Sequence, residues 1–488
     1  MEIFLPSITI HHKFFFSLTK TPAFHRPSTN STKPHHYKVV PHKQNTLQIQ
    51  DFQQNWTLKR TLFEKLKHKD SNPVQILEQD GDWSKDLFWA VVGFLNQTSK
   101  SNHVLQVFEK WTSNDDSRVS VFNYERIVRL LVEEGLIEDA ILGLNKIKGV
   151  YGVKSCLEIY DMVIFGLVKM GQFDDALVYL KEMEDNEMKA STAVYNVLIR
   201  AYAENGLYDD MAKCVKRMEV KGCFPDQCTY NLLIRTFSSA GLIKRMEKTY
   251  RIVISKRMDV EDTTMVAMLE AYANFGDVEK MDKVYRRVLR LKPRVYLSDD
   301  LIRKVAVVYI ENYMFSKLED MGINLYSKSG NNDIVWCLRL LSHACLLSRT
   351  GMKSVVREME YKKVKWSVTI ANIMLFAYAK MKDFERFDVV LLEMADRKVK
   401  PDIVTCGILS DAHGWAVDRA GELGSWRKMG FFRDVVELKT DPLVLAAFGK
   451  GDFLKTVEEL DQIKSKDWTY EHLIKTVNQH QHRKQIKV

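Results

Sequence analysis

The sequence predicts an all-α fold, an α-solenoid superhelix of stacked 35-residue helix-turn-helix repeats. Glycines recur at intervals of 35 residues, at Gly171, Gly206, Gly241 and Gly276. A fixed period of roughly 20 to 50 residues is the signature of a stacked-repeat architecture. The chain also holds only 10 prolines in 488 residues, five of them within the first 41, so the remainder is almost free of helix breakers.

The first 50 residues differ from the rest in charge. They contain six Lys or Arg, six of the 13 histidines and one acid, Glu2, which gives a local net charge of +5. Basic, hydroxyl-rich and acid-poor segments are typical of organelle transit peptides. Arg26 is the only arginine there, whereas mitochondrial presequences tend to be Arg-rich. We therefore predict that residues 1–50 are a disordered transit peptide for the chloroplast, with the mitochondrion as the alternative.

The body of the chain has the composition of a folded protein. It is 46% hydrophobic and 28% charged overall. No apolar stretch approaches the roughly 18 residues that span a bilayer, so we expect no membrane association. The seven cysteines lie between Cys156 and Cys406 without a CxxC pair, which matches neither a disulfide framework nor a zinc site. We expect residues 51–84 to be an N-terminal linker or cap, and residues 438–488 to hold a degenerate last repeat and a frayed basic end.

Each repeat is predicted to contain two amphipathic helices. Tyr195, Leu198, Ile199 and Tyr202 fall at i, i+3, i+4 and i+7, on one apolar stripe. Gly206 then ends the first helix, because glycine adopts the left-handed conformation of a C-terminal cap without a Cβ clash. A lone hairpin cannot bury both of its stripes, so neighbours must stack. The array 85–437 divides into units 85–120, 121–156, 157–191, 192–226, 227–261, 262–298, 299–334, 335–367, 368–402 and 403–437, followed by a degenerate pair at 438–466.

Motifs for enzyme chemistry are missing from the sequence. It contains no HExxH, GxSxG or Walker-type GxxxxGK[ST] string. His472, His480 and His482 sit in the basic C-terminal end, where solvated side chains are expected. We therefore expect no catalytic residues, no metal site, no cofactor and no small-molecule substrate.

Three segments carry a family signature. VYNVLIRAYAENG (194–206) is closed by CFPD, TIANIMLFAYAK (369–380) is closed by VKPD, and TYNLLIRTFSSAG covers 229–241. The Tyr-Asn opening and Pro-Asp closing resemble the pentatricopeptide repeat proteins of the P class, which are plant organelle RNA binders. The resemblance covers roughly residues 85 to 440. It implies that the α-solenoid binds single-stranded organelle RNA.

The resemblance also implies which residues read bases. In the family, one base is read per repeat, by the fifth residue of the repeat with support from its last residue. The implied pairs are Asp161 with Ser191, Asn196 with Asp226, Asn231 with Glu261 and Asn372 with Asp402, with Val266 in the next reading place. By family analogy Asn196/Asp226 and Asn372/Asp402 prefer uracil, whose edge an amide can both donate to and accept from. Arg303, Arg339 and Gly407 occupy the reading place of later units and give no readable code.

Phosphate contacts require cations on the same face, since backbone charge supplies much of the affinity for nucleic acid. The candidates are Lys169 and Lys380, two turns beyond the reading residue, and Arg129, Arg200 and Arg235, one turn beyond it. Glu133 and Glu204 take the place of the lysines in two other units, which weakens this prediction.

The favoured interpretation is sequence-selective binding of single-stranded organelle RNA, which affects its processing, stability, splicing or translation by occupying a site. Other organelle RNA-processing proteins are expected as further partners. The alternative is a protein–protein interaction scaffold within an organelle ribonucleoprotein complex. The nearly neutral array and the poor copies between 299 and 367 favour that alternative.

Overall fold

The computed structural model describes residues 56–68, 71–290, 296–329, 332–413, 433–461 and 468–486. The predicted transit peptide lies outside the described residues. The chain divides into two compact units, Met1–Asp116 and Ser117–Val488. The all-α prediction is confirmed: in the described ranges, extended pairing is limited to one isolated bridge between Val435 and Thr469. None of the described helices has both the length and the apolar character that a bilayer crossing requires.

The N-terminal unit consists of short packed helices. They are a helix over residues 56–67, α2 (Pro73–Asp80), α3 (Lys85–Gln97), η1 (Ser101–His103) and α4 (Val104–Ser113). Its core is aromatic: Phe88 stacks on Trp111 with ring centroids 4.1 Å apart, and the Trp111 Nε1–H donates to the Trp83 carbonyl at 2.8 Å. In its described residues, the region predicted to be a linker or cap holds two helices, the helix over residues 56–67 and α2.

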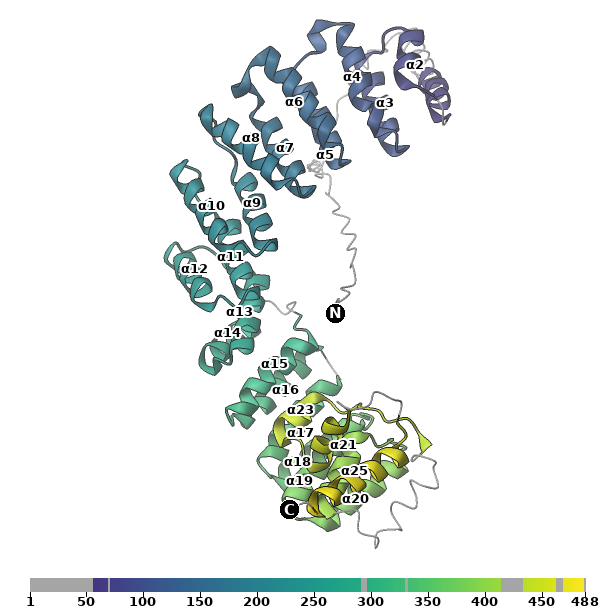
Figure 1. The fold of residues 1–488 in the computed structure, drawn as a ribbon, viewed down its shortest axis with the longest axis vertical. Helices are drawn as coiled ribbons and strands as arrows, with labels where there is room; N and C mark the ends of the chain where they lie inside the picture. Colours follow the sequence, from purple (N-terminus) through teal and green to yellow (C-terminus); the bar gives the residue numbers. More distant parts are fainter. Residues whose placement is uncertain are drawn as a thin grey trace, which may run out of the picture. The chain divides into compact units, whose positions relative to one another are not determined.

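The second unit is an array of helical hairpins, as predicted (Figure 1). The hairpins are α5 (Val121–Glu133) with α6 (Ile137–Tyr151), α7 (Leu157–Lys169) with α8 (Phe173–Asp185), α9 (Thr192–Glu204) with α10 (Tyr208–Val220), α11 (Gln227–Ser239) with α12 (Ile243–Ser255), α13 (Asp262–Phe275) with α14 (Val278–Arg290), α15 (Asp299–Glu311) with α16 (Phe315–Ser329), α17 (Asp333–Cys345) with α18 (Arg349–Tyr361), and α19 (Val368–Lys380) with α20 (Phe384–Asp396).

The first helices of successive hairpins pack against one another. Contacts join α5, α7, α9, α11, α13 and α15 in sequence, and likewise α17, α19 and α21 (Ile403–His413). Figure 1 shows α5, α7, α9 and α11 in one row and α6, α8, α10 and α12 in another. We call the surface that the first helices present the first-helix face.

Left-handed residues end the first helices, as the glycine spacing predicted. Gly171, Gly206, Gly241 and Gly276 have φ of 78°, 69°, 67° and 77°. In the later repeats, Tyr313, Leu347 and Lys382 take the same place with φ of 56°, 52° and 56°. A side chain with a Cβ is strained in this conformation, by roughly 1–2 kcal/mol. The turn geometry is thus maintained even where glycine is missing.

The position of the left-handed residue also shows where the repeat that contains α17 begins. With Leu347 in this place, the repeat begins at Asp333, where α17 starts, so the predicted boundary at 335 is wrong by two residues. Its reading place is therefore Cys337 and not Arg339. Gly351, the glycine of this repeat, does not mark the end of its first helix. Gly351 lies in the first turn of α18, where a Cβ would clash with the His343 ring.

The C-terminal helices depart from the repeat pattern. Beyond α21, the structure describes α23 (Pro442–Phe448), α24 (Asp452–Asp461) and α25 (Tyr470–Ile486). Helix α24 packs against α21, with the Leu454 Cγ 3.0 Å from where a Cβ on Gly407 would lie. The predicted second helix of unit 403–437 falls largely outside the described residues. The expectation of a frayed end is wrong for 470–486, because α25 buries Tyr470, Leu473 and Val477 on one stripe and packs against α24.

Candidate nucleic-acid interface

Helix capping positions the residues that were predicted to support base reading. The last residue of a repeat is the N-cap of the next first helix, where a side-chain oxygen accepts from a free backbone N–H. Ser191 Oγ accepts from Val194 N at 3.3 Å, and Asp226 Oδ1 accepts from Thr229 N at 2.8 Å. Asp402 Oδ1 accepts from Thr405 N at 3.1 Å, whereas Glu261 makes no such cap. Capping explains why Ser and Asp recur at this place.

A hollow on the first-helix face lies between α5, α7 and the start of α9. It has a volume of about 410 Å³, and we call it the α5/α7/α9 groove. Four of the predicted site residues line it together: Arg129, Asp161, Lys169 and Ser191. Glu133, which was predicted to weaken phosphate binding, lies there too.

The polar atoms of two consecutive reading places are incompletely satisfied. Burial raises the pKa of Asp161, although hydrogen bonds from Ser191 partly offset the rise. Within the described part of the chain, Asp161 Oδ1 and Asn196 Oδ1 are buried and have no hydrogen-bond partner. A buried oxygen without a donor costs roughly 1–3 kcal/mol. A ligand that donates to these atoms would recover that free energy.

Four of the five predicted phosphate-binding cations fall into two groups. Lys169 and Arg200 are exposed, and the structure gives neither an ion pair with another described residue. In contrast, Arg129 pairs with Glu125 at 2.9 Å, and Arg235 pairs with Glu261 at 2.5 Å. The first group is open to an anionic ligand, whereas the second is already neutralised within the chain.

Asn231 does not face an open surface. Its exposed fraction is 0%, and its amide is hydrogen-bonded on both sides. Nδ2 donates to the carbonyls of Gln227 and Asp259 at 2.9 and 3.3 Å, and Oδ1 accepts from Glu261 N at 3.0 Å. The structure thus seals the amide that was expected to face a base. Its base-reading role stays a prediction, as does that of the half-buried Val266.

Asn372 and Asp402 are also covered, by the chain just before α23. They are 0% and 1% exposed. Asn372 Nδ2 donates to Thr440 Oγ1 at 2.7 Å and to Asp402 Oδ1 at 3.0 Å. Lys380, predicted to contact phosphate, instead lies 5.2 Å from the centroid of the Phe448 ring. This predicted reading pair is therefore closed in the structure.

Sequence reasoning missed Phe165. Its side chain lines the α5/α7/α9 groove and is 47% exposed. It stands one turn beyond Asp161, in the place that Arg129 and Arg200 take in neighbouring repeats. The same phase argument that singled out these arginines could have found it. An exposed aromatic ring offers a stacking platform for a base.

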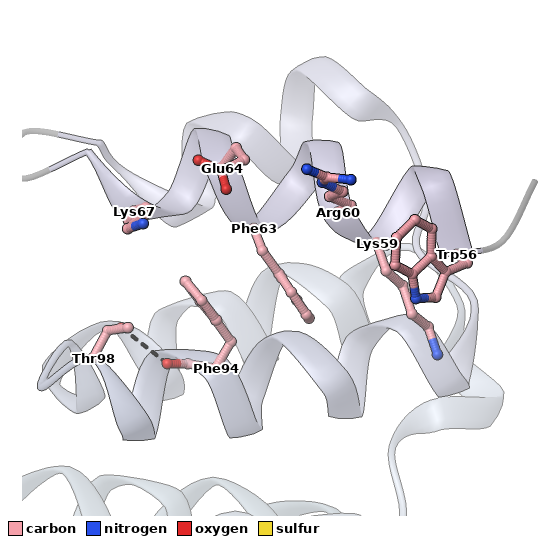
Figure 2. Close-up of a pocket in the computed structure, with 8 residues that line it drawn as sticks. All are labelled: Trp56, Lys59, Arg60, Phe63, Glu64, Lys67, Phe94 and Thr98. Atoms are coloured by element: carbon pink, nitrogen blue, oxygen red, sulfur yellow. Dashed lines mark hydrogen bonds between the residues drawn. The ribbon is translucent and has the colours of Figure 1, made fainter.

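The N-terminal unit has a second hollow, shown in Figure 2. It has a volume of about 460 Å³ and lies between the helix over 56–67 and α3. Phe63 and Phe94 stack there with centroids 4.6 Å apart, and the Arg60 guanidinium lies 5.6 Å from the centre of the Trp56 ring. Its charged lining residues are Lys59, Arg60, Lys67 and Glu64. This surface was not predicted, because residues 51–84 were expected to form only a linker or cap.

Comparison with known proteins gives the family. Residues 190–239 match the PPR repeat family, residues 354–413 the pentatricopeptide repeat domain, and residues 158–188 and 263–292 the PPR repeat. A chloroplastic pentatricopeptide repeat-containing protein of Arabidopsis thaliana is 53% identical over 429 residues, which cover 86% of this chain and 85% of the relative. That relative confirms the predicted chloroplast localisation.

Solved structures with a similar fold are more distant. The maize pentatricopeptide repeat protein PPR10 is 16% identical with a TM-score of 0.38, over 80% of this chain and 59% of that protein. PPR10 in complex with an 18-nucleotide psaJ RNA element has a TM-score of 0.40 at 16% identity, over 83% of this chain and 57% of PPR10. The chain thus spans less than two thirds of the length of PPR10. On the strength of the helical hairpins and the Arabidopsis relative, this chain belongs to the pentatricopeptide repeat proteins.

Proposed function

We propose that this protein binds single-stranded RNA in the chloroplast through the first-helix face of the repeats between 121 and 298. The observation that carries the proposal is the pair of buried, unpartnered oxygens at Asp161 and Asn196 in the described chain. They occupy the same place in consecutive repeats, which is the spacing that one-base-per-repeat recognition requires.

Each open side chain of the face has a proposed role. Asn196, with Asp226 as the last residue of its repeat, reads one base, and the family resemblance assigns it uracil. The Phe165 ring stacks on a base, because every base presents a π face. Lys169 and Arg200 meet phosphates. The Asp161 carboxylate only accepts hydrogen bonds, so this residue can pair only with a base that donates one.

Site occupancy is the proposed mechanism. A bound tract of RNA blocks nucleases or prevents an RNA hairpin from forming, and so alters processing, stability, splicing or translation. The proposal assigns no catalytic step to this chain. Residues 1–50 act in it only as the transit peptide, and the P-class subtype remains a prediction.

Selection from randomised RNA tests the proposal. Recombinant protein without residues 1–50 is expected to show salt-sensitive affinity and to enrich uracil at the nucleotide opposite Asn196. Asn196→Val is expected to weaken binding selectively at that nucleotide, by about 1–3 kcal/mol. An equal loss on all RNAs would contradict the assigned role, and affinity without salt dependence would contradict the proposal as a whole.

A protein-interaction scaffold is the second candidate, and one observation favours it. The first-helix face of the later repeats holds a helix of this same chain, α23, which packs against α15, α17 and α19. That face can therefore accommodate a peptide. The scaffold predicts that the recombinant protein lacks RNA affinity while the open face of the early repeats captures a partner chain.

A further inference from the structure

The segment 439–448, which we call the C-terminal plug, lies on the first-helix face of three consecutive repeats. It includes α23, which packs against α15, α17 and α19, as Figure 1 allows the reader to follow. Leu443 and Val444 at the centre of the plug are both 0% exposed. These three helices begin the repeats at 299, 333 and 368.

The plug contacts or covers the reading place of each of these repeats. Arg303 donates through Nε and Nη2 to Asp441 Oδ2, both at 2.9 Å. Cys337 is buried, and its pKa is raised by burial and further by the Asp441 carboxylate. Asn372 Nδ2 donates to Thr440 Oγ1 at 2.7 Å. The plug thus hydrogen-bonds to the residue at the reading place of the first and third of these repeats, and the residue at the reading place of the second is buried.

The backbone of the plug is held as firmly as its side chains. Asp402 Oδ2 accepts from Lys439 N at 3.0 Å, from Thr440 N at 2.8 Å and from Thr440 Oγ1 at 2.7 Å. Asp441 N donates to Thr369 Oγ1 at 3.0 Å. Three successive N–H groups thus find acceptors on the array. Removing the plug would exchange these three hydrogen bonds to the Asp402 carboxylate for hydrogen bonds to water, and hydrogen bonds to a charged acceptor are among the stronger ones in proteins.

The end of the plug also takes up the stacking place. The Phe448 ring stacks on Phe376 with centroids 5.1 Å apart and planes 10° apart, and Lys380 lies over the Phe448 ring. Phe376 occupies the place in its repeat that the exposed Phe165 occupies in the repeat at 157. An aromatic side chain therefore fills the position where a base would stack.

We propose that the C-terminal plug is a permanent occupant of this face, so that the repeats at 299, 333 and 368 hold protein and do not read RNA. The inference rests on the proposed function, since it limits the RNA tract to the earlier repeats. Its basis is the number and burial of the contacts: an ion pair at Arg303, the hydrogen bonds of Asp402 and Asn372, and the buried Leu443 and Val444. A segment so completely satisfied is part of the fold, and RNA does not displace it.

Hydrogen exchange by mass spectrometry, with and without a uridine-rich single-stranded RNA long enough for every repeat, tests this on the full chain. Peptides over 437–448 are expected to exchange equally in both states, while peptides over α7 and α9 slow by about tenfold on RNA binding. Faster exchange of 437–448 in the complex, or slower exchange over α15 and α19, would overturn the proposal that the plug stays in place. If no peptide slows and no RNA binds, the proposed function fails instead.

A matched pair of substitutions gives an independent readout. Asn196→Val is expected to remove the preference for uracil at one nucleotide, whereas Asn372→Val is expected to change the preference at none. Equal effects of the two on base preference would overturn the proposal. Leu443→Arg combined with Val444→Arg is expected to release the plug and lengthen the RNA footprint by about three nucleotides, one for each uncovered repeat. If that double variant does not fold, the exchange experiment on the unaltered chain still decides.

Discussion

The repeats that begin at Leu157 and Val368 present similar side chains at the same places, but one is open and the other is covered. An aromatic ring follows the reading residue by one turn in both, and a lysine follows it by two. Phe165 is 47% exposed, whereas the Phe376 ring is stacked against Phe448. The position of a residue within the repeat therefore determines where its side chain lies on the hairpin. A segment distant in sequence decides whether a ligand can reach it.

The largest expected effect is the loss of stability caused by substitutions in the C-terminal plug, which covers the later repeats. Leu443→Asp or Val444→Asp places a charge where the wild-type side chain is 0% exposed. Each is expected to lower the free energy of unfolding by about 3–5 kcal/mol, because it loses apolar burial and buries an unpaired group. Chemical denaturation followed by circular dichroism measures this. Val178→Asp is the control: the side chain is 64% exposed, and a change within about 0.5 kcal/mol is expected.

The two phenylalanines allow a sharper comparison. Phe376→Ala loses the stack with Phe448 and is expected to lower the free energy of unfolding by about 2 kcal/mol, with little effect on RNA affinity. Phe165→Ala should leave stability nearly unchanged but weaken RNA binding by about tenfold, since base stacking contributes roughly 1–3 kcal/mol. Thermal unfolding and filter binding separate the two quantities. Similar RNA losses for both variants would mean that the two repeats are equally open.

The two lysines extend the comparison to charge. Each phosphate contact on a single strand contributes about 0.7 to the slope of log K against log salt. Lys169→Gln is expected to reduce that slope by about this amount. Lys380→Gln should leave it unchanged, because the C-terminal plug covers the reading place of the repeat that carries this lysine. Binding titrations across a series of salt concentrations provide the measurement, and equal slopes for Lys169→Gln and wild type would remove Lys169 from the interface.

The smallest effect is expected at Asp161. Burial holds its pKa above the ordinary value in the folded state, so folding favours the protonated carboxyl. The ionised form therefore costs stability at pH values above the folded-state pKa, and the cost is relieved as the pH falls through it. Asp161→Asn is expected to raise the free energy of unfolding at neutral pH by less than about 1 kcal/mol. The advantage should shrink in acid; an advantage that grows as the pH falls would contradict the assignment.

Most of the fold was accessible from the sequence because it depends on local signals. The 35-residue spacing and the apolar stripes predicted the hairpins, and the four glycines predicted where the first helices end. The register failed only at Asp333, where Leu347 adopts the left-handed conformation without the glycine that would have marked it.

The sequence predicted where the candidate binding residues lie in each repeat, but not whether their side chains are accessible to a ligand. Asp161, Ser191, Arg129 and Lys169 were singled out from their phase, and the structure brings them together in one groove. The covering of Asn372 was not predictable, because its contact with Thr440 spans 68 residues and no periodicity relates the two. The sealing of Asn231 likewise depends on carbonyl groups, which a sequence pattern does not display.

The N-cap at the end of each repeat links recognition to folding in a way that restricts change. Ser191, Asp226 and Asp402 each support a helix by accepting a backbone hydrogen bond. A substitution that retunes the neighbouring base contact must also keep an oxygen there, or the following hairpin loses roughly 1 kcal/mol. Fewer residue types are therefore tolerated at the last position of a repeat than at its fifth position.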